Sequence, residues 1–318
     1  MAQFFIRTLA TLLIVGSLLP LHSCRYNRKY LALGSRLIEY ATKANFSEAN
    51  LPREPHLEFR MCQFPFFGPD MFRALDTSTK RVTIRKGKVR NVLINHDATV
   101  EELQVIDSGL VTLEAEIDQP NYVLKKVTIR SKEYRNWSAS LRFLEMLEEI
   151  DIAYCSVSYL HMQWFEKYDK LKALDVSHNK LSRLDVGFSK LLPLERMHLW
   201  GNRLEQLYRF PEAFPALKMV TLAQNRWRCQ WVSVVRGAML ARGVELLDMD
   251  SVCLAGWENN GGLCCRRGNF VNLTSLNRAH QDDRNITQQL NHIMGTDGSV
   301  IGMQLGNTTV FLDKHFAI

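Results

Sequence analysis

Two aspartates and a histidine stand at matching places in the sequence, each between two apolar residues. They are Asp151, Asp175 and His198, separated by 24 and 23 residues. Two carboxylates beside an imidazole can transfer protons or bind a divalent metal. If neighbouring strands of one sheet carry them, the side chains lie about 4.8 Å apart. Since an open sheet does not exclude water, we expect no catalytic, metal or cofactor site here. The alternatives are a recognition patch and a plain polar surface.

Residues around this trio extend the candidate surface. The outward position between the apolar residues of each predicted strand forms a central column along the sheet. Its residues are Arg60, Thr83, Gln104, Thr128, Asp151, Asp175, His198 and Thr221. Beside the column, the N-terminal half is basic through Arg81, Arg85, Lys126 and Arg130, and Glu149 adds to an acidic middle. We expect Trp200 to be exposed, as hot-spot tryptophans are before binding, unless a neighbouring side chain shields it. The predicted binding residues are Arg85, Arg130, Asp151, Asp175, Arg196, His198 and Trp200.

The composition is that of a globular protein and argues against several function classes. The chain has 318 residues, of which 46% are hydrophobic and 23% charged, and its formal net charge is +7. The positive excess is spread along the chain, whereas a nucleic-acid groove needs clustered basic residues. The sequence has no glycine-rich phosphate loop, no H-E-x-x-H or G-x-S-x-G motif, and no metal-spaced Cys/His set. We therefore expect a binding protein that is not an enzyme.

Three segments of the chain align with one another without a gap. They begin at Leu171, Leu194 and Leu217, and they share the pattern L-x-x-L-x-L-x-x-N, which resembles the leucine-rich repeat. Weaker copies begin upstream at Leu147, Leu124, Val100 and Thr79, with a degenerate first turn around residues 59–66. One repeat cannot bury its inward leucines alone, so the repeats must stack. The expected fold class is α/β: a leucine-rich repeat solenoid with a parallel β-sheet on its concave face and a disulfide-bearing C-terminal cap.

The asparagine of each repeat falls in the turn that follows the strand. Its amide is expected to bind backbone groups inside the solenoid. Cys155 occupies this position in the preceding repeat. Because cysteine also fills a small buried site, we expect Cys155 to be a buried, unpaired thiol.

The first residues predict a secreted, extracellular protein. Arg7 precedes an apolar run over residues 9–19, which is typical of a secretory signal peptide of residues 1–23 with cleavage before Cys24. An uncleaved anchor and a bacterial lipoprotein signal are the alternatives. No later stretch is long and apolar enough to span a membrane. N-glycosylation sequons begin at Asn45, Asn136, Asn272, Asn285 and Asn307.

Secretion favours disulfide bonds between the other cysteines. Cys24 and Cys62 are the N-terminal candidates for one bond, and residues 28–44 have the apolar spacing of a helix covering the first repeat. At the other end, a helical run over residues 232–242 follows the last repeat. The cysteines there are Cys229, Cys253, Cys264 and Cys265. Adjacent cysteines rarely bond to each other. Either Cys229 and Cys253 each bind one member of the double cysteine, or they bind each other and leave it open to another chain.

The Trp-Arg-Cys-Gln-Trp segment at 227–231 and the double cysteine at 264–265 resemble the mosquito leucine-rich repeat immune proteins. The segment also resembles the cysteine-bearing C-terminal caps of extracellular leucine-rich repeat proteins, many of which have a second cysteine where Trp231 stands. The resemblance to the mosquito proteins implies disulfide-linked dimers that bind complement-like thioester proteins, and it favours the open arrangement. The function expected is protein recognition in insect innate immunity, and extracellular matrix or cell-surface adhesion is the alternative.

The expected organisation is signal peptide 1–23, N-terminal cap 24–66, repeats 67–226, C-terminal cap 227–268, and a tail 269–318 with a short amphipathic helix.

Overall fold

The computed structural model describes residues 25–27, 34–43, 51–186 and 193–267, and two short strands near the C-terminus. The chain divides into two units, Met1–Arg267 and Gly268–Ile318. The second unit contains the antiparallel pair β20 (Met303–Leu305) and β21 (Thr308–Val310). The predicted signal peptide, the predicted tail helix, Cys24 and the sequons at Asn45, Asn272, Asn285 and Asn307 lie outside the described residues.

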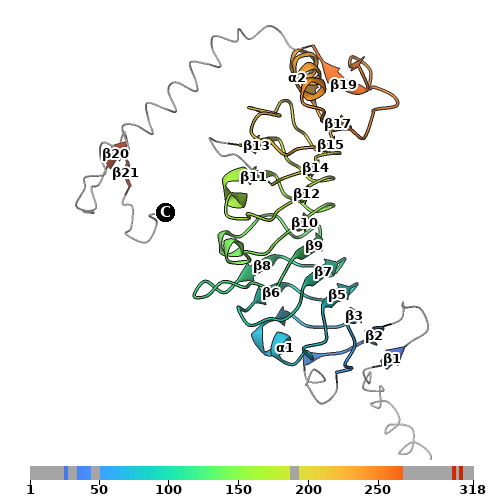
Figure 1. Ribbon diagram of the computed structural model, residues 1–318, viewed down its shortest axis with the longest axis vertical. Coiled ribbons are helices and arrows are strands. Elements are labelled where there is room, and N and C mark those ends of the chain that lie inside the picture. Colours follow the sequence, from blue (N-terminus) through green and yellow to red (C-terminus); the bar gives the residue numbers. More distant parts are fainter. Residues whose placement is uncertain are drawn as a thin grey trace, which may run out of the picture. The chain divides into compact units, whose positions relative to one another are not determined.

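The first unit is built on one eleven-stranded sheet whose strands follow one another along the solenoid (Figure 1). All neighbouring strands pair in parallel except β1 and β2, which are antiparallel. This confirms the predicted fold class. The strands are β1 (Arg25–Asn27), β2 (Ser35–Glu39), β3 (His56–Arg60), β5 (Arg81–Arg85), β7 (Glu102–Ile106), β9 (Lys126–Arg130), β10 (Glu149–Asp151), β12 (Ala173–Asp175), β14 (Arg196–His198), β15 (Met219–Thr221) and β17 (Glu245–Leu246).

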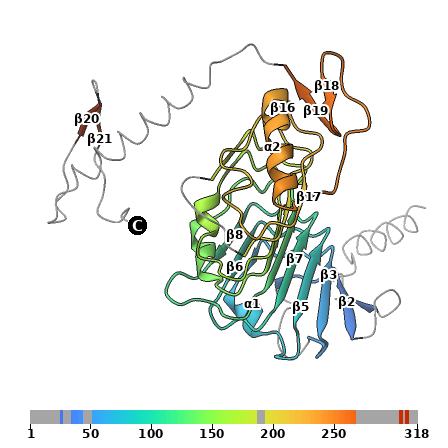
Figure 2. The same ribbon diagram turned by 45° about the horizontal axis from the view of Figure 1, so that its top comes forward.

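Shorter elements line the opposite, convex side of the solenoid (Figure 2). Two small parallel sheets lie there: β4 (Phe66–Phe67) with β6 (Asn91–Ile94) and β8 (Thr112–Ala115), and β11 (Tyr159–His161) with β13 (Arg183–Asp185). The helical turns are α1 (Pro69–Arg73), η3 (Ala139–Phe143) and η4 (Met162–Phe165). Between the two sides runs one continuous apolar core, because every repeat contributes inward residues such as Leu57, Ile84, Val127 and Leu174.

The segment predicted to be an N-terminal helix contains a strand instead. Strand β2 lies parallel to β3, with Ile38 beside Phe59 in the register. Leu37 and Ile38 are both buried, which the helical spacing did not anticipate. The hydrogen bonds and packing between β2 and β3 therefore determine the conformation of this segment more than its helical spacing of apolar residues does. Strands β2 and β3 are thus already part of the sheet, within the segment expected to be a cap.

The repeat asparagines bind backbone groups inside the turns, as predicted. The Oδ1 atom of Asn179 accepts from the Val157 N–H at 2.9 Å, and its Nδ2 donates to the carbonyls of Ile152, Val176 and Ser177. Asn202 and Asn225 repeat this geometry one and two repeats further on. Each asparagine therefore joins two consecutive repeats.

Smaller residues fill the same turn position upstream. Cys155 is buried and unpaired, as predicted, and its Sγ lies 3.4 Å from the Ile129 carbonyl. Burial raises the pKa of the Cys155 thiol to about 12. Ser108 donates to the carbonyls of Ile84 and Ile106. Cys62 is also buried here, and its bond to Cys24 stays a prediction because Cys24 is not among the described residues.

One edge of the sheet carries charges of alternating sign. The residue just before each of seven consecutive strands is, in order, Lys80, Glu101, Lys125, Glu148, Lys172, Glu195 and Lys218. Ion pairs join Lys125 to Glu101 at 2.7 Å, Lys218 to Glu195 at 3.0 Å and Lys172 to Glu148 at 3.6 Å. We call these seven residues the edge ladder. Because these pairs are exposed to solvent, each contributes little to stability.

Two disulfide bonds close the C-terminal cap. The cap contains β16 (Trp227–Arg228), α2 (Cys229–Ala241), β18 (Glu258–Asn260) and β19 (Leu263–Arg266). Cys229 is bonded to Cys265 and Cys253 to Cys264, so the expected opening of the double cysteine to another chain is wrong. The physical reason is that neighbouring residues of a strand point to opposite faces. Strand β19 thus presents one cysteine to α2 and the other to the loop that holds Cys253.

Two carboxylates take over the hydrogen bonds that a further repeat would make. Asp248 accepts from the N–H groups of Leu222 and Ala223, both at 2.8 Å. Asp250 accepts from Gln224 at 2.8 Å and from Cys264 of the cap at 2.7 Å. Burial raises the pKa of Asp248, although these two backbone hydrogen bonds oppose the shift. The two aspartates therefore end the solenoid and attach the cap to it.

Candidate recognition surface on the concave face

The concave sheet brings most of the predicted central column together. Asp151, Asp175, His198 and Thr221 occupy paired positions on four consecutive strands, as expected. Upstream the column continues through Thr128, Gln104 and Thr83 to Glu58. Arg60 is therefore wrongly placed by the sequence. It pairs with Arg85 in the next column because His56 and Arg81, which begin neighbouring strands, are 25 residues apart rather than 23.

The acidic side chains in the middle of the surface bind neighbouring donors of the same chain. The Asp151 carboxylate accepts from Arg130 Nη2 at 2.8 Å and from the Ala153 N–H at 3.0 Å. Asp175 accepts from the Ser177 N–H at 2.8 Å. His198 Nδ1 lies 3.4 Å from the hydroxyl of Thr221. Of the described residues, no group of three or more His, Cys, Asp or Glu side chains is placed to hold a metal ion.

A second column, formed by the first residue of each strand, is a row of ion pairs. Arg81 binds Glu102, and Lys126 Nζ lies 2.9 Å from Glu149. Arg196 reaches the same Glu149 at 3.2 Å from two strands away, because the intervening strand offers only Ala173. The hydrogen bond from Lys126 lowers the pKa of Glu149, aided by the charge of Arg196. Arg196 thus binds an acidic residue of its own chain.

Tyr154, His178 and Trp200 form an aromatic row in the turns that follow the strands, and the sequence predicted only Trp200 of these. Trp200 is half-buried against the core rather than exposed, and its ring packs edge-on to His178 with ring centroids 4.2 Å apart. His178 stacks in turn on Tyr154, also at 4.2 Å, and the Arg130 guanidinium lies 5.4 Å from the Tyr154 ring. Tyr154 and His178 have φ of +55° and +51°, a conformation that repeats at the turn after the strand. Burial lowers the pKa of His178.

The sequence did not single out Tyr154, although a signal was present. Tyr154, His178, Gly201 and Gln224 each directly precede the asparagine position of their repeat, so they form one column. Tyr154 is 49% exposed, which makes it a large aromatic side chain available to a partner.

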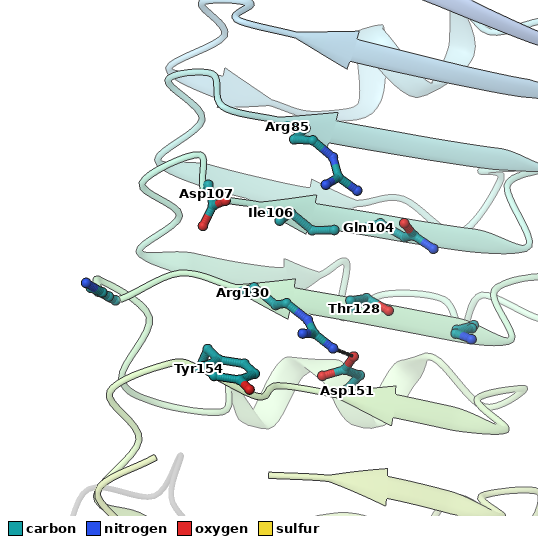
Figure 3. Close-up of a pocket in the computed structure, with 10 residues that line it drawn as sticks. Arg85, Gln104, Ile106, Asp107, Thr128, Arg130, Asp151 and Tyr154 are labelled. Carbon is teal, nitrogen blue, oxygen red and sulfur yellow. Dashed lines mark hydrogen bonds and ion pairs between the residues drawn. The ribbon is translucent and has the colours of Figure 1, made fainter. Parts of the chain in front are cut away.

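The concave face has an open hollow of about 640 Å³ beside this row (Figure 3). Strands β5, β7, β9 and β10 supply most of its floor, and Tyr154 lies at its end. The predicted residues Arg85, Arg130 and Asp151 line it, whereas Asp175, Arg196, His198 and Trp200 do not. Its lining consists of Arg85, Gln104, Ile106, Asp107, Lys126, Thr128, Arg130, Lys132, Asp151 and Tyr154.

One of the arginines in the hollow lacks a full partner. Glu58 is buried and accepts two hydrogen bonds from Arg60, the shorter at 2.8 Å. Arg85 Nε approaches the same carboxylate only to 3.9 Å, and this nitrogen is buried without a hydrogen-bond partner. Two guanidinium groups therefore share one carboxylate, which leaves one positive charge facing the hollow.

Two findings bear on the surroundings of the protein. Asn136, the sequon whose asparagine the structure describes, is exposed, as glycan attachment requires. Within the described ranges, no helix is long and apolar enough to cross a membrane.

Comparisons with known proteins agree with the fold. A family model of the leucine-rich repeat matches residues 145–204, and no curated protein matches the sequence. Human 5T4, a trophoblast glycoprotein, is 19% identical with a TM-score of 0.52, over 66% of this chain and 84% of that one. The mosquito LRIM1/APL1C complex is 19% identical with a TM-score of 0.48, over 81% of this chain. The chain spans 58% of that matched partner's length. Residues 145–204 thus match the leucine-rich repeat family, and the first unit has the fold of a leucine-rich repeat solenoid.

Proposed function

We propose that this is an extracellular recognition protein that binds a protein partner through its concave face. The observation that carries the proposal is the hollow, which combines an exposed aromatic side chain, Tyr154, with the incompletely paired Arg85. Tyrosine and arginine are enriched among the residues that dominate binding energy. The two disulfide bonds of the cap favour an oxidising compartment, and hence secretion.

The partner class proposed is a complement-like thioester protein, in insect innate immunity. The support for this is the resemblance of the 227–231 segment and the double cysteine at 264–265 to mosquito immune proteins. The LRIM1/APL1C complex, whose name records two proteins bound together, is one of the similar structures. In this chain the closed cap favours non-covalent association over a disulfide-linked dimer.

Capture from insect haemolymph on the immobilised protein tests the proposal. Tyr154→Ala should reduce capture of the partner about tenfold or more, as truncation of a hot-spot residue does. The matched control is Tyr159→Ala on the convex side, where Tyr159 is 43% exposed. Recovery of a thioester protein supports the immune function, and retention by insoluble matrix supports adhesion. Equal capture by both variants would place recognition elsewhere.

A further inference from the structure

Two arginines stand on either side of an apolar residue in the column that adjoins the hollow. Arg85, Ile106 and Arg130 occupy paired positions on β5, β7 and β9. With strands about 4.8 Å apart, the arginines begin roughly 10 Å from each other. Figure 3 shows all three among the side chains around the hollow, with Gln104 and Thr128 beside them.

The two guanidinium groups differ in what they already bind. Arg130 donates to Asp151 at 2.8 Å and lies over the ring of Tyr154, so its charge is matched within the protein. Arg85 lies 3.9 Å from a carboxylate that Arg60 already occupies. Its side chain is 41% exposed, so a ligand can reach it. Arg85 is therefore the arginine of this pair that still needs an anionic partner.

We propose that Arg85 anchors a glutamate or aspartate side chain of an acidic peptide segment, and that Ile106 and Tyr154 contact an apolar residue next to it. This inference rests on the proposed function, since it names the chemistry of the segment that the concave face recognises. A guanidinium group can bind a carboxylate with two parallel hydrogen bonds, which fixes both position and orientation.

The surrounding charges favour a peptide over a sulfated polysaccharide. Four basic residues line the hollow, but two of them are already paired: Lys126 with Glu149 and Arg130 with Asp151. Asp107 also lines it, so acidic side chains lie close to Arg85 and Lys132. A polyanion with a sulfate on most of its sugars would bring several negative charges against these carboxylates. A peptide segment with one or two acidic residues meets Arg85 without that repulsion, and its apolar neighbour gains contact with Ile106 and Tyr154.

Selection of a displayed library of random dodecapeptides on the immobilised full chain tests this inference. Selected peptides should be enriched in Asp or Glu next to an apolar residue, and synthetic copies should bind more weakly as salt rises. Arg85→Gln should weaken them about tenfold or more, the effect of losing a hydrogen-bonded charge pair. Arg183→Gln, on convex strand β13 with Arg183 62% exposed, is the matched control and should leave binding unchanged. Arg85→Lys keeps the charge and should fall between wild type and Arg85→Gln.

Several outcomes would overturn the inference. They are selection of peptides without acidic residues, selection of no peptides, equal binding by Arg85→Gln and wild type, and binding of heparin oligosaccharides that requires Arg85. Unchanged thermal unfolding of Arg85→Gln separates loss of the anchor from loss of the fold. If Tyr154→Ala loses the haemolymph partner while Arg85→Gln keeps it, the proposed function stands and the acidic anchor does not. If the wild-type protein captures no partner, the proposed function itself fails.

Discussion

Replacing Asn179 by leucine tests how the repeats are held together. The change removes the acceptor of the Val157 N–H and the amide that binds the Ile152 carbonyl, and both groups are buried. A buried polar group left without its partner costs about 1–3 kcal/mol, so the two together cost roughly 2–6 kcal/mol. For a domain of this size, 1 kcal/mol shifts the melting temperature by about 2–4 °C. Asn179→Leu should therefore lower it by at least about 4 °C.

Thermal unfolding followed by circular dichroism measures this, with Asn259→Leu as the control. Asn259 is exposed, and its partners, the Gly262 N–H and the Asp250 carbonyl, can bind water instead. Asn179→Ser should lie between wild type and Asn179→Leu, because Ser108 already fills the equivalent position of another repeat. Equal melting temperatures for Asn179→Leu and Asn259→Leu would refute the buried role assigned to the asparagine.

Four further predictions follow from the fold and the concave face. Cys155 should resist iodoacetamide at pH 8 in the native protein and react once urea unfolds it, because its pKa is about 12; mass spectrometry reads the modification. Cys264 should be found bonded within the chain by peptide mapping, and a dimer band that disappears with reductant would contradict this. Because the pKa of Glu149 is lowered from 4.5, this residue stabilises the fold at pH values above 4.5, and the stabilisation is lost as pH falls through the pKa of the folded state. In Glu149→Gln, the urea concentration at the unfolding midpoint should therefore depend less on pH across that range. Gly201→Ala should lower the melting temperature, because its φ is +70° and a Cβ there would lie 2.9 Å from His178 Nδ1.

Regular spacing made the downstream half of the sheet predictable. Segments at a period near 23 placed Asp151, Asp175 and His198 on adjacent strands, and the structure has them there. Between β3 and β5 the repeat length is 25 residues. The spacing therefore predicted Arg60 at the position in the central column that Glu58 occupies in the structure. The first turn around residues 59–66 is degenerate, so its sequence has no repeat motif that would fix the register of Arg60.

Contacts between repeats account for what the sequence missed. The segment that forms β2 has helical spacing, and its strand conformation comes from pairing with β3. Trp200 is shielded by His178, which belongs to the previous repeat. Arg85 is incompletely paired because Arg60 lies closer to the Glu58 carboxylate, at 2.8 Å against 3.9 Å. This arrangement depends on the positions of three side chains from two strands. Each of these features is set by neighbours more than 20 residues away in the chain, beyond any local pattern.

The alternating charges of the edge ladder distinguish odd-numbered from even-numbered repeats of the solenoid. Lysine and glutamate alternate over seven consecutive repeats, from Lys80 to Lys218, so the repeating electrostatic unit is two repeats long. Excising the repeat that begins with Glu148 would bring Lys125 beside Lys172, two like charges on adjacent strands. Excising two consecutive repeats would restore the alternation. Duplication and loss of repeats in such a chain should therefore be better tolerated in pairs, and an engineer lengthening the solenoid should insert an even number.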